Sequence, residues 1–338
     1  MKQFCRELAT LAPAVGARFA GRLYGLATLA TAIMALWPAL AMLQRAQQYD
    51  VALSLHEYLA NALRFNVGGP YPERTVEYGT AADGTKLLLD VWRTDKVPAG
   101  TLRPAFVRVH GGGWTHGARS GLGDWNSWLN ALGYDVFDVE YRMPPPERWR
   151  DEIGDVKCAL GWLVANAAKY DVDTARISVT GYSAGGNLAL LAAYSVGDPD
   201  LPPSCDVPGV PVRSVVNIYG PSDLGLLYRS SGSLEYAQDS LNQYVGGSPT
   251  EYPERYKALS PVSHVGTATP PTITFLGGSD RIVRTEQAEV LHQALTKAGV
   301  VNEVYFLPAN DHGFDFNWGG FGTQVARAKI EQFLARQR

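Results

Sequence analysis

The stretch Gly181-Tyr-Ser-Ala-Gly-Gly186 places one serine among small residues, directly after the apolar run Arg176-Ile-Ser-Val-Thr180. The run predicts a buried strand, and the residues from Gly186 to Tyr194 have the period of a helix. At such a strand–turn–helix corner, small residues two positions before and after Ser183 let the strand and the helix approach each other. The turn strains the backbone and exposes the hydroxyl, so Ser183 is a candidate nucleophile. The alternative is a tight corner without chemistry, because G-x-S-x-G also occurs by chance.

A second glycine-rich stretch, His110-Gly-Gly-Gly-Trp114, also follows a β-rich run. Successive glycines let backbone N–H groups converge on one point without obstruction by side chains. We expect the N–H groups of Gly112 and Gly113 to form an oxyanion hole with that of Ala184, which lies at a helix N-terminus. The alternative is a flexible loop without a catalytic role. We expect His110 to fix this loop by hydrogen bonds rather than to act as a base.

A serine hydroxyl is a weak nucleophile near neutral pH, so it needs a base and a carboxylate that orients the base. His312 follows the last β-rich run of the chain, and Asp280 follows the run before it. The order Ser183, Asp280, His312 is the order expected of the α/β-hydrolase arrangement. Weaker alternatives are His264 as the base, and Asp223 or the neighbouring Asp311 as the acid.

From about Thr75 onward, short β-rich runs alternate with longer helical stretches. The first two runs flank Asp83-Gly84, which predicts an antiparallel hairpin. An antiparallel start followed by this alternation predicts one domain over residues 75–338, with a mostly parallel eight-stranded sheet and helices on both faces. The predicted strands are 75–78, 86–92, 105–109, 135–139, 176–180, 214–218, 272–275 and 303–306, and the main predicted helices are 151–169, 186–194, 285–297 and 323–337.

Two segments do not fit the alternation. Gln44 to Gly69 has a helical pattern, so residues 44–74 are interpreted as a helical linker or cap. Pro221 to His264 is a long polar and aromatic insertion between two predicted strands. Long loops of this kind often form lids or binding loops, so either segment is a candidate cover for a site at the strand ends. The alternative is a surface excursion without a role.

Residues 1–43 have a different composition from the rest of the chain. Leu23 to Leu43 is 21 residues without an Asp, Glu, Lys, Arg or His, about the length that crosses ~30 Å of hydrocarbon as a helix. Basic residues outnumber acidic ones before it, which favours a cytoplasmic N-terminus and a catalytic domain on the other side of the membrane. The alternatives are a cleaved signal peptide with its cleavage site at Ala39-Leu-Ala41, followed by secretion, a helix docked on the domain, and a core segment.

Charge and cysteine content exclude some classes of function. The 30 basic and 33 acidic residues are interleaved and leave a net charge of −3, which argues against nucleic acid as a partner. The three cysteines, Cys5, Cys158 and Cys205, lie far apart and show no CxxC spacing. They predict neither a zinc site nor a disulfide framework.

Five motifs in order, HGGGW, Glu140-Tyr-Arg-Met with the following PPPE, GYSAGG, GGSDRIV and DHGFD, resemble one known group. The chain from about Thr75 to its C-terminus is similar to α/β-hydrolase esterases of the hormone-sensitive-lipase type and to the related acetyl- and feruloyl-esterase-like (BD-FAE-like) hydrolases. In that family the HGGG glycines and the residue after the serine form the oxyanion hole. The family acid lies in a D-x-x-[VI] loop, which matches Asp280, and the base lies in an H-x-F loop, which matches His312.

Two departures refine the resemblance. Tyr182 stands before the serine, where relatives of hormone-sensitive lipase usually have Asp or Glu, and Asp280 lacks the typical D-P-L sequence. Both departures favour the acetyl- and feruloyl-esterase-like branch, as does the stretch from Tyr244 to His264. The apolar segment Leu23 to Leu43 lies outside the resemblance.

The motifs together predict a serine carboxylic ester hydrolase that acts through an acyl-enzyme on short- to medium-chain esters, with a small molecule or a lipid as substrate. Trp114 and Tyr182 are candidates for the substrate pocket, although a large aromatic residue beside a strand is about as often packing. The mechanism needs no metal and no organic cofactor. The alternatives are an arylformamidase or small amidase, and an inactive hydrolase scaffold used for binding.

Overall fold

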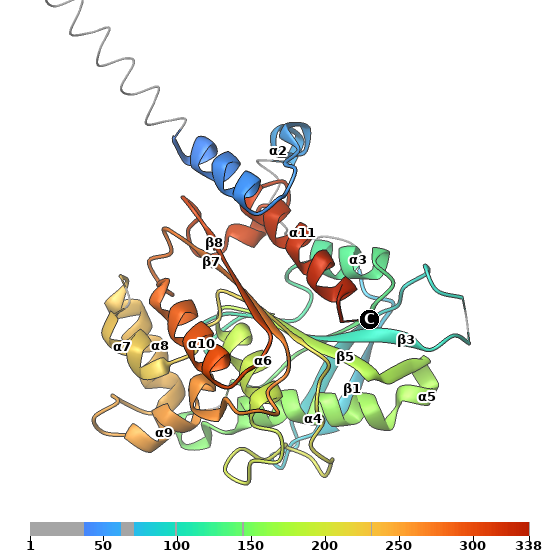
Figure 1. Cartoon of the computed structure of the whole chain (residues 1–338). Helices are drawn as coiled ribbons and strands as arrows, with labels where there is room; N and C mark the ends of the chain where they lie inside the picture. Colours follow the sequence, from blue (N-terminus) through green and yellow to red (C-terminus); the bar gives the residue numbers. More distant parts are fainter. Residues whose placement is uncertain (1–36, 62–70, 99, 144, 231, 338) are drawn as a thin grey trace, which may run out of the picture.

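The computed structural model describes residues 37–61, 71–98, 100–143, 145–230 and 232–337 (Figure 1). Its centre is one eight-stranded sheet with the order β1-β2-β4-β3-β5-β6-β7-β8. β1 and β2 are antiparallel, β2 is antiparallel to β4, and all later neighbours are parallel. The strands are β1 Arg74–Thr80, β2 Lys86–Trp92, β3 Arg103–Val109, β4 Asp135–Val139, β5 Val172–Tyr182, β6 Val215–Ile218, β7 Thr272–Gly277 and β8 Asn302–Leu307.

The eight predicted strands are confirmed, and their burial explains why the sequence predicts them. Every residue of β4, β6 and β7 is buried, because helices cover both faces of a parallel sheet. The predicted hairpin at Asp83-Gly84 is also confirmed. Gly84 adopts φ +85°, and the Thr85 N–H donates to the Asp83 carboxylate at 2.9 Å. These local features close the turn between β1 and β2.

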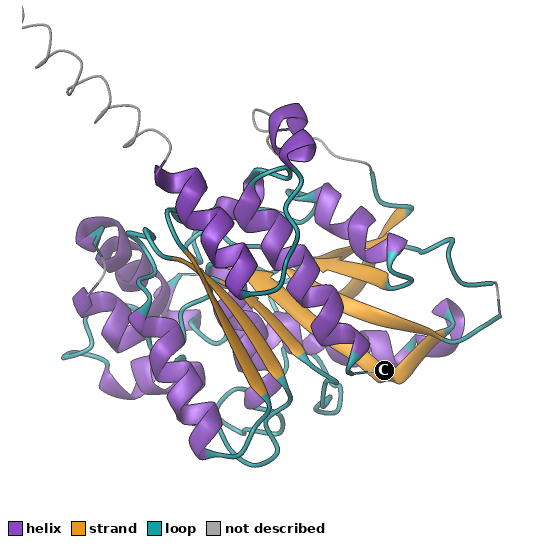
Figure 2. Cartoon of the chain, turned by 45° about the horizontal axis from the view of Figure 1, so that its top comes forward, coloured by secondary structure: helices purple, strands orange, loops and turns teal. Residues whose placement is uncertain are grey.

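Helices pack on both faces of the sheet (Figures 1 and 2). α3 and α11 contact one face, and α4, α6 and α10 contact the other. The predicted helices are confirmed within a few residues, whereas α3 and the helices α7, α8 and α9 of the insertion are absent from the prediction. The α-helices are α2 Leu55–Asn61, α3 Gly123–Ala131, α4 Asp151–Ala165, α5 Ala167–Tyr170, α6 Ala184–Tyr194, α7 Leu224–Ser230, α8 Leu234–Val245, α9 Pro253–Ala258, α10 Glu286–Lys297 and α11 Phe321–Ala335, with 3-10 turns η1 Pro146–Arg148, η2 Pro261–His264 and η3 Phe314–Phe316.

The predicted membrane segment Leu23 to Leu43 lies partly outside the described residues, which begin at residue 37. Residues 37–48 are helical, and this helix buries Met42 and Ala46 against the domain. Just after it, the Tyr49 hydroxyl donates to the Phe306 carbonyl at 3.0 Å and accepts the Phe306 N–H at 3.1 Å. Of the helices that the structure describes, none has the length and apolar character needed to cross a membrane.

The predicted helical linker 44–74 is divided into two helices. Asp50 turns the chain with φ +52° between the helix of residues 37–48 and α2. Tyr58 of α2 stacks on Phe321 at 4.3 Å, so α2 packs beside the start of α11. Residues 62–70 of the predicted linker lie outside the described part of the chain.

The sequence-based expectation for the cysteines is wrong in one respect, because Cys158 and Cys205 form a disulfide. Cys158 lies on α4, and Cys205 lies 47 residues later in the loop between α6 and β6. This loop packs along α4, where the Ser204 N–H donates to the Gly154 carbonyl at 2.9 Å. Spacing along the chain could not show the pairing, because long-range packing brings the two residues together.

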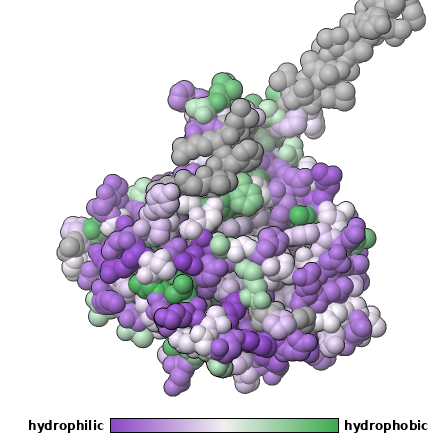
Figure 3. All heavy atoms as spheres, turned by 180° about the vertical axis from the view of Figure 1, so that it is seen from behind, coloured by the Kyte–Doolittle hydropathy of each residue, from purple (hydrophilic) through white to green (hydrophobic). Residues whose placement is uncertain are grey.

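The outer surface has a different character from the core. On the face opposite the view of Figure 1, hydrophilic residues cover most of the surface and hydrophobic residues gather only in small patches (Figure 3). Large apolar side chains of the sheet, such as Phe106, Phe137 and Phe275, have no exposed surface. Their burial supplies the main stabilising free energy of the domain.

Candidate active site

Ser183 lies at the corner between β5 and α6, as the sequence predicts. Its backbone has φ +54° and ψ −126°, a combination that non-glycine residues rarely adopt. A Cβ atom on Gly181 would lie 2.2 Å from the Gly185 carbonyl oxygen, and one on Gly185 would lie 2.2 Å from the His110 carbonyl oxygen. The corner therefore requires glycine at both positions. The Ser183 N–H donates to the Ile218 carbonyl of β6 at 3.0 Å and holds the turn on the sheet.

The structure brings Ser183, His312 and Asp280 into one chain of hydrogen bonds. His312 Nε2 lies 2.9 Å from Ser183 Oγ, and His312 Nδ1 lies 2.8 Å from Asp280 Oδ2. The carboxylate can only accept, so Nδ1 carries the proton and the Nε2 lone pair faces the serine hydroxyl. This is the tautomer that a general base needs.

The Asp280 carboxylate is held in place by its own loop. Its side chain is fully buried, and Oδ1 accepts the N–H groups of Ile282 and Val283 at 2.9 and 2.8 Å. Gly277 lets this loop approach the histidine loop, because a Cβ atom there would lie 2.4 Å from the Asn310 carbonyl oxygen. The backbone of its own loop therefore fixes the orientation of the carboxylate, independently of its bond to the imidazole.

The alternative acids and the alternative base make other contacts. Asp311 accepts the backbone N–H of His312 itself at 2.8 Å, so it does not orient the imidazole. Asp223 accepts a backbone N–H at the start of α7. His264 bonds through Nε2 to the Ala258 carbonyl at 2.8 Å. Each of these side chains therefore has a local structural partner away from the Ser183 hydroxyl.

The HGGG loop adopts a backbone that favours glycine. Gly112 and Gly113 have φ +130° and +58°. A Cβ atom on Gly112 would lie 1.8 Å from the His116 carbonyl oxygen. Ala184 begins α6, so its N–H lacks a partner within the helix and can point at an anion. The three predicted oxyanion-hole donors thus lie on two glycine-dependent turns that pack against each other.

His110 anchors the HGGG loop from below. It is fully buried, its Nδ1–H donates to the Gly111 carbonyl at 2.8 Å, and its ring stacks on Tyr141 with centroids 4.2 Å apart. The Tyr141 hydroxyl donates to the His110 carbonyl at 3.1 Å. Burial lowers the pKa of His110 and favours its neutral form. These contacts agree with a structural role for His110.

Arg119 ties the end of the same loop to the sheet, and the sequence did not single it out. Its Nε–H donates to Asp90 of β2 at 2.9 Å, and its Nη1–H donates to Glu140 at 3.2 Å. The Glu140 carboxylate also accepts the Arg119 N–H at 2.9 Å. Glu140 is the first residue of the EYRM motif, so this motif was the signal in the sequence that could have pointed to the contact with Arg119.

The insertion between Pro221 and His264 forms α7, α8, α9 and η2, and α8 packs over the HGGG loop. A Cβ atom on Gly113 would lie 2.8 Å from the Tyr236 hydroxyl and 3.0 Å from the Ser240 hydroxyl. Trp114 stacks on Tyr244, with centroids 5.1 Å apart and planes 8° from parallel. The insertion is therefore a cover at the strand ends rather than a free surface excursion.

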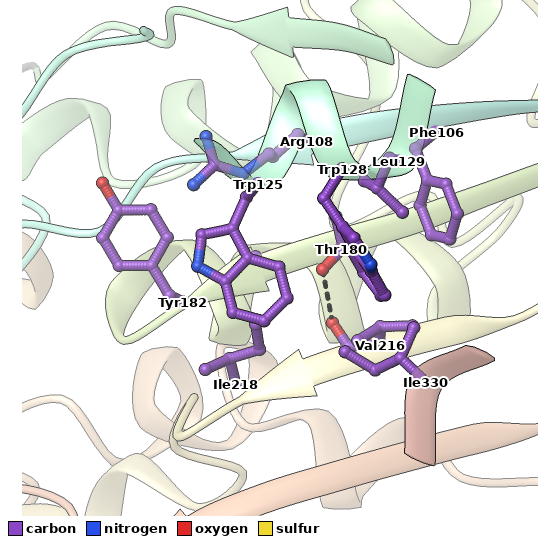
Figure 4. A pocket seen from close by; sticks show the side chains of 11 residues that line it. Phe106, Arg108, Trp125, Trp128, Leu129, Thr180, Tyr182, Val216, Ile218 and Ile330 are labelled. Carbon is purple, nitrogen blue, oxygen red and sulfur yellow. Dashed lines mark hydrogen bonds between the residues drawn. The ribbon is translucent and has the colours of Figure 1, made fainter. Parts of the chain in front are cut away.

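Tyr182 points to the face of the sheet that carries α3 and α11 (Figure 4). The Arg108 guanidinium lies 5.3 Å from the centre of its ring, and burial raises the pKa of Tyr182 to about 12. Trp114 and Tyr182, the two predicted pocket residues, are both more than nine-tenths buried. Tyr182 borders a small pocket lined by Phe106, Arg108, Trp125, Trp128, Leu129, Thr180, Gly181, Tyr182, Val216, Ile218 and Ile330.

Two residues beneath His312 were also missed. Tyr219 follows β6 directly, and its ring lies 4.5 Å from the imidazole, centre to centre. The Tyr219 hydroxyl donates to Asp315, the last residue of the DHGFD motif. The motif was visible in the sequence, but the partner of its second aspartate was not.

Comparisons with known proteins agree with this geometry. Residues 89–295 match the model of the BD-FAE family. The chain is 32% identical to esterase LipQ of Mycobacterium tuberculosis over 80% of its own length, and 35% identical to esterase LipC of the same species over 77%. In both matches the chain covers 64% of the relative. The propionate-bound structure of a thermophilic esterase, Est2, from Thermogutta terrifontis superposes with a TM-score of 0.64 at 25% identity, over 78% of this chain and 93% of that chain.

The family match confirms the resemblance drawn from the five motifs. It begins within β2, ends within α10, and contains the HGGGW, GYSAGG and GGSDRIV motifs. Since the family model matches more than half of the sequence, this chain belongs to the BD-FAE family.

Proposed function

We propose that the chain is a serine carboxylic ester hydrolase that acts through an acyl-enzyme. The observation that carries this proposal is the hydrogen-bonded series Ser183, His312, Asp280 at the carboxyl ends of three strands. The names of the curated relatives support it, because LipQ and LipC are described as esterases. The chain spans less than two thirds of the length of each of these relatives, and esterase activity is therefore our proposal for this chain.

In the proposed reaction, Ser183 Oγ attacks the ester carbonyl carbon while His312 Nε2 accepts the hydroxyl proton. The N–H groups of Gly112, Gly113 and Ala184 stabilise the negative charge that develops on the carbonyl oxygen. His312 then donates its proton to the leaving alcohol, and an acyl-serine remains. Water attacks the acyl-serine by the same steps and releases the carboxylic acid. Asp280 stabilises the protonated imidazole throughout.

We propose esters with short to medium acyl chains as the substrates. α8 lies directly over the oxyanion loop, where Tyr236 and Ser240 approach Gly113 and Tyr244 stacks on Trp114. This cover limits the room beside the nucleophile. The Est2 structure with bound propionate supports a short acyl group in a related fold.

A panel of p-nitrophenyl esters tests both the reaction and the acyl preference. We expect the highest kcat/KM for acetate to hexanoate and a decrease of about tenfold or more at dodecanoate, because even a single methylene that does not fit costs about 1–3 kcal/mol. N-formylkynurenine serves as the comparison substrate for the formamidase alternative. Faster cleavage of the formamide than of every ester would overturn the assignment, and equal rates at all chain lengths would overturn the proposed acyl preference.

We further propose that Leu23 to Leu43 anchors the protein in a membrane and that the catalytic domain acts outside the cytoplasm. The uncharged run of 21 residues and the basic residues before it support the anchor. The Cys158–Cys205 disulfide supports an oxidising compartment.

Fractionation of cells that produce the full chain tests this location. We expect the protein to remain in the membrane fraction after an alkaline carbonate wash, and to be accessible to an external protease once the outer layers of the cell are opened. The cysteine pair should be protected from a thiol reagent until a reductant is added. Recovery in the cytosolic fraction with free thiols would contradict the proposal.

A further inference from the structure

Tyr219 packs directly against the imidazole of His312. It follows β6, and its side chain is almost fully buried. The ring centroids of Tyr219 and His312 lie 4.5 Å apart, with the planes inclined at 55°. Tyr219 has φ +40°, an unfavourable backbone for a bulky residue. Filling the core does not require a strained backbone, so the contact of the Tyr219 ring with the proposed base calls for a separate explanation.

The hydroxyl of Tyr219 is bonded to a second carboxylate, which belongs to the histidine loop itself. It donates to Oδ1 of Asp315, a residue of η3 with no exposed surface. The loop is fixed on both sides of the carboxylate. Trp125 Nε1–H of α3 donates to the Asp315 carbonyl at 3.4 Å, and the Thr323 hydroxyl of α11 donates to the Phe314 carbonyl at 3.0 Å.

The charged and titratable groups around Asp315 come from several elements. Burial raises the pKa of Asp315 to about 6, whereas the bond from Tyr219 and the charges of Arg108 on β3 and His312 oppose this rise. Burial, with the neighbouring Asp315, Tyr182 and Asp280, raises the pKa of Tyr219. Above about pH 6 the pair is therefore a neutral phenol that donates to a buried anion.

We propose that Tyr219 and Asp315 form a second hydrogen-bonded pair that positions His312 and stabilises its protonated form, in addition to Asp280. Asp280 bonds the Nδ1 edge of the imidazole, whereas Tyr219 packs on the ring and limits its tilt. The negative charge of Asp315 favours the imidazolium that forms in the transition state. Both are positioning residues, and the inference rests on the proposed hydrolase function.

Two single variants and their combination test the pair. Tyr219→Phe keeps the ring and removes the hydroxyl, and Asp315→Asn removes the charge. We expect each to lower kcat for p-nitrophenyl butyrate by about tenfold with KM changed by less than about twofold, because the interaction acts on a transition-state charge. The double variant should be no slower than the slower single variant, since both act through one bond.

The pH–rate profile gives a readout that a purely structural role would not move. In Asp315→Asn the loss of negative charge disfavours protonated His312, so the acid limb of kcat/KM should move to lower pH by about half a unit. In Tyr219→Phe the carboxyl loses its donor, its pKa rises further, and the charge is lost at higher pH. The acid limb of this variant should therefore also move to lower pH, by less than in Asp315→Asn.

Tyr194→Phe is the matched control. Tyr194 is also buried, and its hydroxyl forms a 2.7 Å hydrogen bond with the Thr272 hydroxyl instead of a residue of the site. We expect its kcat and pH profile to equal those of the wild type. If Asp315→Asn does not fold, the comparison of Tyr219→Phe with Tyr194→Phe decides alone.

Multiplicative losses in the double variant, or wild-type kcat and acid limbs in both single variants, would overturn the role of the pair. Labelling by a fluorophosphonate separates this failure from that of the proposed function. A wild-type protein that is labelled at Ser183 and hydrolyses esters retains the function even if the pair fails. A folded wild-type protein that is neither labelled nor active would contradict the proposed hydrolase function itself.

Discussion

Replacement of Ser183 by alanine is expected to abolish ester hydrolysis while leaving the fold intact. The substitution removes only the Oγ atom, which lies 2.9 Å from His312 Nε2, and adds no atom to the tight corner. We expect kcat for p-nitrophenyl butyrate to fall by about 10⁴-fold or more, with a residual rate from the oxyanion donors. Circular dichroism and the midpoint of thermal unfolding should match the wild type, and fluorophosphonate labelling should be lost.

Ser178→Ala provides the control for this experiment. Ser178 lies on the same strand, is buried, and shares a hydrogen bond of 2.9 Å with Ser214. Its hydroxyl bonds to Ser214 and not to His312, so its variant should retain both labelling and hydrolysis. A Ser183→Ala protein that keeps more than about one per cent of the wild-type rate would contradict the role of Ser183 as the nucleophile.

Gly185→Ala is expected to destabilise the domain and to inactivate it. The added Cβ would lie 2.2 Å from the His110 carbonyl oxygen and 2.3 Å from that of Val109. Both are backbone atoms of β3 and the oxyanion loop, so they cannot rotate away as a side chain could. We expect the free energy of unfolding to fall by about 3 kcal/mol or more. The variant molecules that do fold should also hydrolyse esters slowly, because the oxyanion loop must move away from Ser183.

Urea unfolding followed by fluorescence measures the stability change, and Gly266→Ala is its control. Gly266 lies in a loop where an added Cβ would meet no atom within 4 Å. Its free energy of unfolding should stay within about 0.5 kcal/mol of the wild type. Equal stability of Gly185→Ala and Gly266→Ala would contradict the close packing of Gly185 against the backbone of β3 and the oxyanion loop.

The strands and the three residues of the hydrogen-bonded series could be predicted from the sequence because their signals are local. Most of the strands carry an apolar run, and Ser183, Asp280 and His312 lie a few residues or fewer after the ends of three of them. Strand ends of a parallel sheet meet at one edge, so residues far apart in the chain could be assigned to one site. α3 was missed because Gly123 to Ala131 mixes the buried Trp125 with a buried asparagine and a buried glycine, which weakens its helical pattern.

Contacts between distant segments could not be predicted. Nothing in the spacing of Cys158 and Cys205 distinguishes this pair from one with Cys5, and only the packing of α4 against the loop before β6 decides it. Tyr219 and Asp315 are 96 residues apart. The side of the sheet to which Tyr182 points depends on the strand register at the end of β5.

The sequence by itself determined the order of strands along the chain, the two glycine-dependent turns, and the identities of the serine, histidine and aspartate. Backbone preferences and hydrophobic periodicity are properties of neighbouring residues, so they can be recognised without coordinates. Only the tertiary structure decided that α8 covers the oxyanion loop, that Tyr182 faces α3 and α11, and that Asp315 lies beneath His312. These placements follow from packing between segments distant in the chain, where burial and hydrogen bonding act together and no local pattern records the partner.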